Sequence, residues 1–392
     1  MYHTPYYLID KDALEAVVTE TNDTLRSYWG NYILGYSYKT NSLPWIIEYF
    51  KRKGFYAEVV SDDEYSLAQY IKVDSTKIIY NGPIKSKETM LQAIQNGCIV
   101  NLDAKREIEW LDDLNNGTSY SVGIRVNFDI EKMCPGESAC GDQGGRFGFC
   151  YENGELKKAI EEIRQKNFRV AGLHLHTSSK SRSINVYRAI AKVACEITQK
   201  YGLELDYVDI GGGFFGGLEN RPTIRDYLKE IVPMLSEQFS PEKTTLIIEP
   251  GMSMIGPNIE YVTSVIDVKD TTYGRFVVTD GSRTQIDPLM SKTSYFYEID
   301  KANQNDGVLE AQVICGYTCM EHDRLFTLKN YPSLRVGDII RYQKVGAYTM
   351  CLTPLFIKYF PDVYVKKNDQ INLVRSRWNA ELYSQGMKES ME

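Results

Sequence analysis

The sequence predicts an α/β fold in which a TIM-like (β/α)8 barrel is combined with a second, C-terminal β-domain. Between residues 32 and 251, short β-rich runs alternate with amphipathic stretches of helical length, without a low-complexity linker. Eight such runs favour a closed parallel barrel, and a doubly wound open sheet is the structural alternative. After Gly256 the helical patterns nearly vanish, and short runs separated by turns indicate the β-domain.

The predicted barrel strands follow one another along the chain, with turn-forming and helix-forming residues between them. They span residues 32–39, 56–61, 77–82, 98–103, 121–127, 169–176, 206–212 and 245–250. The helical patterns between them include residues 43–53, 63–72, 86–96, 155–166 and 184–201. Because the active sites of such barrels lie at the carboxyl ends of the strands, we expect the functional residues there.

The β-domain is predicted from further strand-like runs on both sides of the barrel. They span residues 259–268, 274–279, 310–315, 325–328 and 338–342, and residues 6–10 are expected to add one more strand. The predicted domain boundaries are therefore 11–258 for the barrel, and 1–10 together with 259–392 for the β-domain.

Length and composition exclude several classes of protein. At 392 residues the chain can form one large domain and a smaller one, and its 43% hydrophobic and 25% charged residues are ordinary for a globular protein. A net charge of −7 without a block of Lys and Arg argues against nucleic-acid binding. The N-terminus lacks a signal-peptide pattern, and no apolar run reaches the roughly 18 residues of a membrane span. We therefore expect a cytoplasmic protein that does not bind membranes.

The cysteines are expected to be free thiols, because they are dispersed through the chain without a secretory signal. They are Cys98, Cys134, Cys140, Cys150, Cys195, Cys315, Cys319 and Cys351. No pair has CxxC spacing and the chain has only four histidines, so we expect no metal site.

Lys39 is the first candidate for chemistry. It ends the strand-like run Gly-Tyr-Ser-Tyr-Lys. Burial and neighbouring charges can lower the pKa of a lysine, which makes the neutral amine available to attack an aldehyde. The alternative is a lysine whose amine reaches solvent from the end of the strand.

Gly211, Gly212 and Gly213 form a second candidate element after the run Tyr-Val-Asp-Ile. Without side chains in the way, their amides can approach an anion closely and cradle a phosphate. A plain flexible turn is the alternative. The spacing does not match G-x-G-x-x-G and no ribose-binding acid follows at the usual distance, so dinucleotide binding is disfavoured.

Glu249 and a pair of histidines complete the candidate site. Glu249 follows Leu-Ile-Ile in a strand expected to be buried, so it needs a cationic partner: a protonated pyridine nitrogen, or an arginine in a structural ion pair. His174 and His176 alternate along one run and point to the same side. Metal binding and packing stay open for this pair, although the flat ring of His176 can also support an aromatic cofactor. An amine, a phosphate cradle, a ring platform and a buried carboxylate at strand ends together predict a pyridoxal 5′-phosphate site.

These motifs resemble those of the fold type III pyridoxal phosphate decarboxylases, the family of diaminopimelate, ornithine and carboxynorspermidine decarboxylases with an alanine racemase-like fold. The resemblance extends over nearly the whole chain. It implies that Lys39 forms the internal aldimine, that His176 stacks on the ring, and that Glu249 pairs with the pyridine nitrogen. The other barrel positions that it assigns to the cofactor pocket are Ser179, Gly211, Gly212 and Gly213 at the phosphate, and Glu58 and Glu64 beside it.

The predicted β-domain carries two further matches. Gly316-Tyr-Thr-Cys319 with Asp323 resembles the reactive-cysteine loop of the family, and Gly346-Ala-Tyr348 resembles its phosphate-binding tyrosine motif. By this resemblance the chain is a head-to-tail homodimer with shared active sites, in which Cys319 from one subunit protonates the product at the barrel of the other. The implied reaction removes the α-carboxylate of an amino acid or amino-acid-derived substrate through an external aldimine and a quinonoid.

Three positions at the substrate end depart from the family pattern. Met252 stands where an arginine usually follows Glu-Pro-Gly, Asp287 where an arginine usually precedes proline, and Met320 where an acid usually follows the cysteine. These departures disfavour diaminopimelate, ornithine and lysine as substrates, because methionine cannot replace bidentate recognition of a carboxylate. Arg283 and Arg182 are candidate replacements that would meet an acidic or amide-linked substrate.

Two alternative functions stay open. An amino-acid racemase on the same barrel would need a tyrosine base facing Lys39, whereas this chain carries the cysteine loop of the decarboxylases. A non-enzymatic protein that carries the cofactor is essentially a barrel without a second domain, so the region after residue 258 argues against it.

Overall fold

The computed structural model describes residues 2–114, 119–302 and 307–387. The chain divides into two compact units, one of Val18–Met254 and one of Met1–Val17 with Ile255–Glu392. The boundary between the units falls inside helix α1 (Lys11–Tyr28). Each unit is described below by itself.

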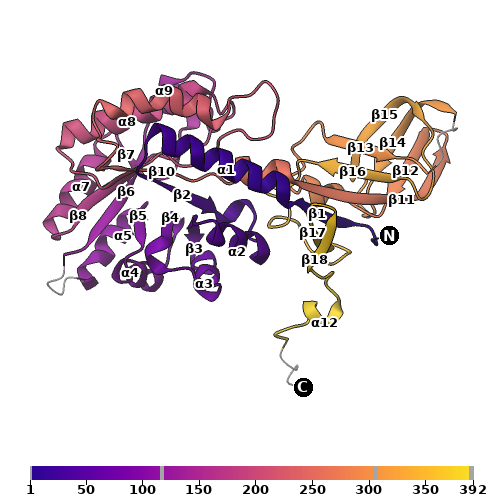
Figure 1. The fold of residues 1–392 in the computed structure, drawn as a ribbon, viewed down its shortest axis with the longest axis horizontal. Coiled ribbons are helices and arrows are strands. Elements are labelled where there is room, and N and C mark those ends of the chain that lie inside the picture. The colour runs from indigo at the N-terminus through magenta and orange to yellow at the C-terminus, as the bar shows by residue number, and fades with distance from the viewer. Residues whose placement is uncertain (1, 115–118, 303–306, 388–392) are drawn as a thin grey trace. The chain divides into compact units, whose positions relative to one another are not determined.

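The first unit is a closed barrel of eight parallel strands (Figure 1). Its strands are β2 (Tyr32–Ser37), β3 (Tyr56–Ser61), β4 (Ile78–Ile84), β5 (Ile99–Leu102), β6 (Ser121–Asn127), β8 (Arg169–His174), β9 (Tyr207–Asp209) and β10 (Thr245–Ile248). They follow the order β5-β4-β3-β2-β10-β9-β8-β6, and β6 pairs with β5 to close the ring. A short strand, β7 (Phe149–Cys150), pairs with the carboxyl end of β6. The predicted barrel is confirmed, and the pairing of β5 with β6 excludes the open sheet.

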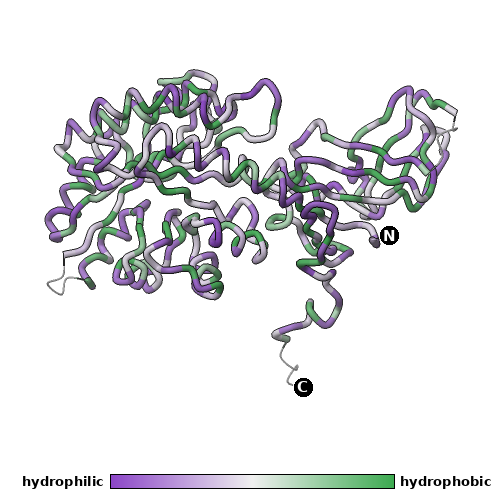
Figure 2. The backbone as a smooth tube through the Cα atoms, in the orientation of Figure 1, coloured by the Kyte–Doolittle hydropathy of each residue, from purple (hydrophilic) through white to green (hydrophobic). Residues whose placement is uncertain are grey.

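Helices surround the barrel because each pairs an apolar face with a polar one. They are α2 (Pro44–Arg52), α3 (Asp62–Tyr70), α4 (Lys87–Gln95), α5 (Lys105–Trp110), α6 (Ile130–Met133), α7 (Glu155–Gln165), α8 (Ile184–Tyr201), α9 (Ile224–Ser236) and α10 (Met252–Ile255). Figure 2 shows hydrophobic residues recurring between hydrophilic ones along this helical layer. Several helices begin at a side-chain cap: the Ser61 hydroxyl accepts a hydrogen bond from the backbone N–H of Glu64 at 3.2 Å, which starts α3 directly after β3.

Part of the barrel interior is filled by the side chain of Tyr207, which packs against glycines on the neighbouring strands β6 and β8. A Cβ atom on Gly172 would lie 2.1 Å from the ring of Tyr207, and one on Gly123 would lie 2.0 Å from its hydroxyl. The Tyr207 hydroxyl donates to Asn101 Oδ1 at 2.7 Å, so the centre of the barrel is polar as well as packed. This polar centre leads towards the candidate site described below.

The second unit is a nine-stranded sheet. Its strands are β1 (Tyr6–Asp10), β11 (Ile259–Thr271), β12 (Gly274–Thr279), β13 (Phe296–Asp300), β14 (Val308–Cys315), β15 (Arg324–Pro332), β16 (Ile339–Gln343), β17 (Asp362–Lys367) and β18 (Gln370–Arg375). The main order is β15-β14-β12-β11-β1-β17-β18, and β16 pairs with β11 and β13. Two short helices, α11 (Arg283–Ile286) and α12 (Ala380–Tyr383), complete the unit. The predicted fold class, a barrel with a C-terminal β-domain, is confirmed.

No helix in the described part of the chain has both the length and the apolar character that crossing a bilayer requires.

Candidate active site

Lys39 lies in a single 3-10 turn, Tyr38–Thr40, which directly follows β2. Its ammonium group is 2.8 Å from Glu58 Oε2, which also accepts a hydrogen bond from the Ser37 hydroxyl at 2.5 Å. The Lys39 side chain is 37% exposed, whereas that of Glu58 is 1% exposed. The amine is therefore accessible, and a buried counter-ion fixes its position.

Glu64 supplies a second carboxyl group beside this ion pair. Its Oε2 atom accepts a hydrogen bond from the Val60 N–H at 2.8 Å. Burial and, as the second largest cause, the charge of Glu58 raise the pKa of Glu64 to about 7, although the hydrogen bond from Val60 and the charge of Lys39 lower it. The Lys39 amine thus pairs with Glu58, and Glu64 beside them is an acid whose pKa is raised to about 7.

Two asparagines connect the polar centre of the barrel to this site. Asn101 Nδ2 donates to Asn81 Oδ1 at 2.8 Å, and Asn81 Nδ2 donates to Glu249 Oε1 at 2.5 Å and to Glu58 Oε1 at 3.1 Å. All four side chains are buried. Asn81 therefore bridges two carboxylates that must stay apart, and together with Asn101 it continues the hydrogen bonds that begin at Tyr207.

Two of the three glycines after β9, Gly211 and Gly212, pass too close to their neighbours for a Cβ atom, and the third, Gly213, has a positive φ angle. Gly211 and Gly213 have φ angles of +70° and +93°, in the region that L side chains rarely adopt. A Cβ atom on Gly211 would lie 2.5 Å from His176, and one on Gly212 would lie 2.2 Å from the carbonyl oxygen of Glu249. The Tyr187 hydroxyl donates to the Gly212 carbonyl oxygen at 2.8 Å and holds the turn from behind.

His176 follows β8 and is locked in one neutral form. Its Nδ1 atom accepts a hydrogen bond from the Gly212 N–H at 3.2 Å, which places the ring proton on Nε2. Burial, followed by the charges of Arg125 and Lys39, lowers the pKa of His176 to about 3. The result is an uncharged flat ring, held against the glycine turn.

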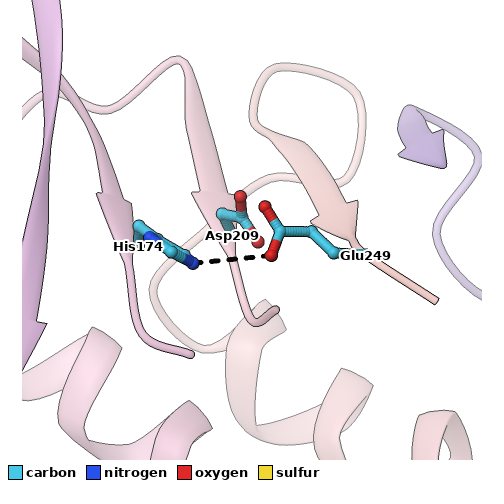
Figure 3. A group of neighbouring side chains, drawn as sticks. All are labelled: His174, Asp209 and Glu249. Atoms are coloured by element: carbon cyan, nitrogen blue, oxygen red, sulfur yellow. Dashed lines mark ion pairs between the residues drawn. The ribbon is translucent and has the colours of Figure 1, made fainter. Parts of the chain in front are cut away.

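The carboxyl ends of β8, β9 and β10 bring together His174, Asp209 and Glu249, all buried (Figure 3). His174 and Asp209 lie opposite each other in the β8–β9 register, and His174 Nε2 is 3.5 Å from Glu249 Oε2. Although burial acts in the opposite direction, the charge of His174, its hydrogen bond, the charge of Lys39 and a hydrogen bond with Asp209 lower the pKa of Glu249. Glu249 is therefore an anion inside the barrel.

Ser179 and Arg182 lie between β8 and α8. The Ser179 hydroxyl accepts a hydrogen bond from the Arg182 N–H at 2.7 Å, and the Tyr227 hydroxyl donates to the Arg182 carbonyl oxygen at 2.7 Å. These bonds hold Arg182 at a φ of +50°. The guanidinium groups of Arg182 and Arg221 lie 5.4 Å and 5.2 Å from the ring centre of Phe215.

The cysteine loop of the second unit is organised by Asp323. The buried carboxylate of Asp323 accepts hydrogen bonds from the Thr318 hydroxyl at 2.6 Å and from the Thr318 and Arg283 N–H groups. A Cβ atom on Gly316 would lie 2.2 Å from Asp323 Oδ2, so the loop needs glycine there. This frame leaves Cys319 exposed.

Two of the three predicted substrate residues of this unit, Arg283 and Asp287, contact each other. Arg283 and Asp287 form an ion pair at 3.0 Å across the four-residue spacing of α11, and Arg283 also donates to the carbonyl oxygens of Met290 and Lys292. Tyr348 adopts a φ of +55°, and Met320 is half-buried. In the barrel unit, Met252 is half-buried as the first residue of α10.

Comparisons with known protein families match most of the chain. The family described as "Pyridoxal-dependent decarboxylase, pyridoxal binding domain" matches residues 14–256, and "Pyridoxal-dependent decarboxylase, C-terminal sheet domain" matches residues 257–346. The chain belongs to the pyridoxal-dependent decarboxylases. The predicted family, the pyridoxal phosphate cofactor and the decarboxylase class are confirmed, and the decarboxylase interpretation is supported over the racemase.

Individual relatives in this family are distant but cover nearly the whole chain. Diaminopimelate decarboxylase of Aquifex aeolicus is 24% identical over 96% of this chain and 90% of its own length. L-glutamyl-[BtrI acyl-carrier protein] decarboxylase of Niallia circulans is 24% identical over 97% of this chain and 92% of its own. The crystal structure of diaminopimelate decarboxylase from M. jannaschii superposes with a TM-score of 0.88 at 22% identity, covering 99% of this chain and 93% of that one.

The barrel end of this decarboxylase fits pyridoxal phosphate, which carries an aldehyde, a basic ring nitrogen and a phosphate. Lys39 offers an accessible amine beside a fixed anion, and Glu249 offers a buried negative charge. Gly211 and Gly213 hold the left-handed backbone that allows close approach to an anion. The residues present therefore match the three functional groups of the cofactor.

Several residues of this site were not among the sequence predictions. Asn81, Asn101, Tyr207 and Asp209 form hydrogen bonds or buried contacts with the predicted residues. A signal for them exists, because each is a polar residue inside or at the end of an apolar barrel strand, where it must find a partner.

Proposed function

We propose that the chain removes the α-carboxylate of an amino-acid-derived substrate with an anionic or acyl-linked far end, and that Lys39 binds the cofactor aldehyde. The observation that carries this proposal is the accessible Lys39 amine, 2.8 Å from buried Glu58 at the carboxyl end of the barrel. When bound, pyridoxal phosphate supplies a ring that accepts the electron pair left by loss of carbon dioxide.

The barrel residues would divide the binding of the cofactor among them. Glu249 would hold the ring nitrogen with its negative charge, and the neutral ring of His176 would support the flat face of the cofactor. The Gly211–Gly213 turn and Ser179 would hold the phosphate, with the Gly213 N–H and the Ser179 hydroxyl as donors, because the N–H groups of Gly211 and Gly212 already donate to Asp209 and His176. Glu58 would hold the Lys39 amine in place beside the cofactor aldehyde.

Cys319 is the proposed proton donor to the substrate carbon after carbon dioxide has left. Its exposure in the Asp323-organised loop leaves the thiol accessible to a second molecule. We propose, as the family resemblance implies, that the protein is a cytoplasmic homodimer in which Cys319 of one subunit completes the barrel site of the other, and that Tyr348 binds the cofactor phosphate.

The proposed substrate class follows from the arginines. Arg283 is engaged by Asp287 and two carbonyl oxygens, which leaves Arg182 as the stronger candidate for binding an anionic group. Among the residues that the structure describes, no carboxylate forms an ion pair with Arg182 or Arg221, and both guanidinium groups pack on Phe215. The Niallia circulans relative is named for action on a glutamyl group attached to a carrier protein, which makes carrier-linked substrates worth testing.

A carbon dioxide release assay with the cofactor-loaded protein tests this proposal. The panel contains diaminopimelate, ornithine, arginine, glutamate and a glutamyl thioester. We expect release from the acidic or acyl-linked compounds, and an increase in their KM of about tenfold or more in an Arg182→Met, Arg221→Met protein, as for loss of a charged hydrogen bond. Arg188→Met is the matched control, because Arg188 is paired with Glu230 on the outer surface. Fastest release from diaminopimelate would contradict the substrate class, and racemisation without carbon dioxide would contradict the reaction.

Two further measurements test the roles of Lys39 and Cys319. Borohydride treatment of the loaded protein should attach the cofactor to the peptide that contains Lys39, and attachment elsewhere would refute that role. Mixing inactive Lys39→Ala and Cys319→Ala proteins should restore roughly a quarter of the activity, because half of randomly paired dimers then contain one intact site of two. No recovery after verified subunit exchange would exclude sites shared between subunits.

A further inference from the structure

Asp209 and His174 are buried ionisable groups to which the proposed reaction assigns no role. Both lie beside Glu249 at the ends of neighbouring barrel strands, and one ligand atom from each of the three residues lies within 4.8 Å of the others (Figure 3). Asp209 and His174 are 0% and 2% exposed. Two adjacent carboxyl groups in such a place cannot both be ionised without a large cost, because their charges repel in a medium of low polarity.

The hydrogen bonds of Asp209 are distributed unevenly between its two oxygens. Oδ1 accepts a hydrogen bond from the Gly211 N–H at 2.8 Å. Oδ2 is buried and has no hydrogen-bond donor in the described part of the chain, while the carboxylate of Glu249 lies beside Asp209. A buried acceptor without a donor is costly, whereas a proton on Oδ2 would turn it into a donor for Glu249.

The environment of the two carboxyl groups decides which one carries the proton. Glu249 receives the Asn81 amide at 2.5 Å and faces His174 and the Lys39 ammonium group. Asp209 instead is subject to burial and to the negative charges of Glu249 and Glu58, all of which raise its pKa. A hydrogen-bond donor and the positive charge of Lys39 therefore act on Glu249, whereas Asp209 Oδ2 has neither, and the proton belongs on Asp209.

We propose that Asp209 is a protonated carboxylic acid that donates a hydrogen bond from Oδ2 to Glu249, and so keeps Glu249 as the single anion directed at the cofactor ring nitrogen. Asp209 is a positioning residue, since it acts on the cofactor only through Glu249. The pairing register of β8 and β9 fixes the position of Asp209, because it places Asp209 opposite His174 in the sheet. The inference rests on the proposed function, because it assigns the ring nitrogen to Glu249.

An infrared measurement on the unmodified protein tests the protonation directly. At about pH 9, where Glu64 with its pKa of about 7 is ionised, the spectrum of the loaded protein should still contain the carbonyl band of a protonated carboxylic acid, and this band should weaken in Asp209→Asn but not in Asp206→Asn. Exposed Asp206 is a suitable control, because it pairs with Arg169 outside the barrel. A loaded wild-type protein without the band would overturn the inference, even if no variant folds.

Variants with the labelled cofactor test the consequence for the ring nitrogen. An asparagine can donate to Glu249 and accept from Gly211, so Asp209→Asn should keep the cofactor Kd within about threefold of the wild-type value. Asp209→Ala should raise the Kd about tenfold to a hundredfold. With 15N-labelled pyridoxal phosphate, the ring-nitrogen resonance should report the protonated form in the wild type and in Asp209→Asn. Loss of that form in Asp209→Asn would show that Asp209 contributes a charge instead, and would refute the inference.

The two proposals fail in different ways. A wild-type protein that does not bind pyridoxal phosphate at all contradicts the proposed function. A protein that binds it through Lys39, yet has an ionised Asp209, contradicts only this inference.

Discussion

Glu64 makes the stability of the barrel depend on pH in a direction opposite to that of most carboxylates. Its pKa is raised from the ordinary 4.5 to about 7 by burial and by the charge of Glu58. The folded barrel therefore binds this proton more tightly than the unfolded chain does, so the free energy of unfolding decreases as pH rises from about 4.5 to about 7. The difference between the two pKa values corresponds to a loss of up to about 3 kcal/mol in the free energy of unfolding above neutral pH.

Replacing Glu64 with Gln should remove this dependence. The amide is neutral at every pH, and its carbonyl oxygen can accept the Val60 N–H that Glu64 Oε2 accepts at 2.8 Å. The variant should match the wild type near about pH 4 and be more stable at about pH 8 by up to about 3 kcal/mol. Urea unfolding followed by tryptophan fluorescence measures both proteins, and Asp63→Asn, at the exposed neighbour in the first turn of α3, is the control. Parallel stability curves for wild type and Glu64→Gln from about pH 5 to about pH 8 would refute this reasoning.

Two glycine substitutions should separate cofactor binding from catalysis. Gly212→Ala places a Cβ atom 2.2 Å from the Glu249 carbonyl oxygen and should raise the cofactor Kd about tenfold or more. Gly145→Ala is the control and should leave the Kd unchanged, because its Cβ atom would have its nearest neighbour at 3.6 Å. Equal cofactor titration curves for the two variants would contradict this prediction. Gly316→Ala places a Cβ atom 2.2 Å from Asp323 Oδ2 and should displace the loop that carries Cys319. We expect kcat to fall while the cofactor Kd stays unchanged. A kcat equal to that of the wild type would exclude the loop from the reaction.

The sequence was most informative where chemistry and strand ends coincide. Predicted and observed barrel strands differ by only a few residues, because β-branched runs bounded by turns define each strand locally. The differences fall at the site itself: β2 ends at Ser37 and β8 at His174, so Lys39 and His176 lie just beyond their strands. The two residues that we propose bind the cofactor thus lie outside the ladder of backbone hydrogen bonds, and strand propensity does not record that departure.

The polar centre of the barrel could not be predicted from local patterns. Asn101 and Tyr207 are more than one hundred positions apart and meet only after the barrel closes. Strands β13 and β18 also escaped prediction, because their residues alternate weakly and lie largely on the surface. Strand β17 escaped prediction although its buried Val363 and Val365 alternate with half-buried residues. The pairing of Arg283 with Asp287 did leave a signal, namely a spacing of four residues, which on a helix brings opposite charges together.

The two ends of the proposed active site differ in how freely they can change. Glu58 and Glu249 are joined through Asn81 and Asn101 to Tyr207, which packs in the barrel core. Altering the cofactor end therefore disturbs the core. Met252, Met320 and Arg182 lie in loops or at the start of a short helix and are not part of that chain of hydrogen bonds. Substitutions there can redirect the choice of substrate at little cost in stability. If the proposed roles hold, this asymmetry would explain why the proposed cofactor residues match the family pattern while the predicted substrate residues depart from it.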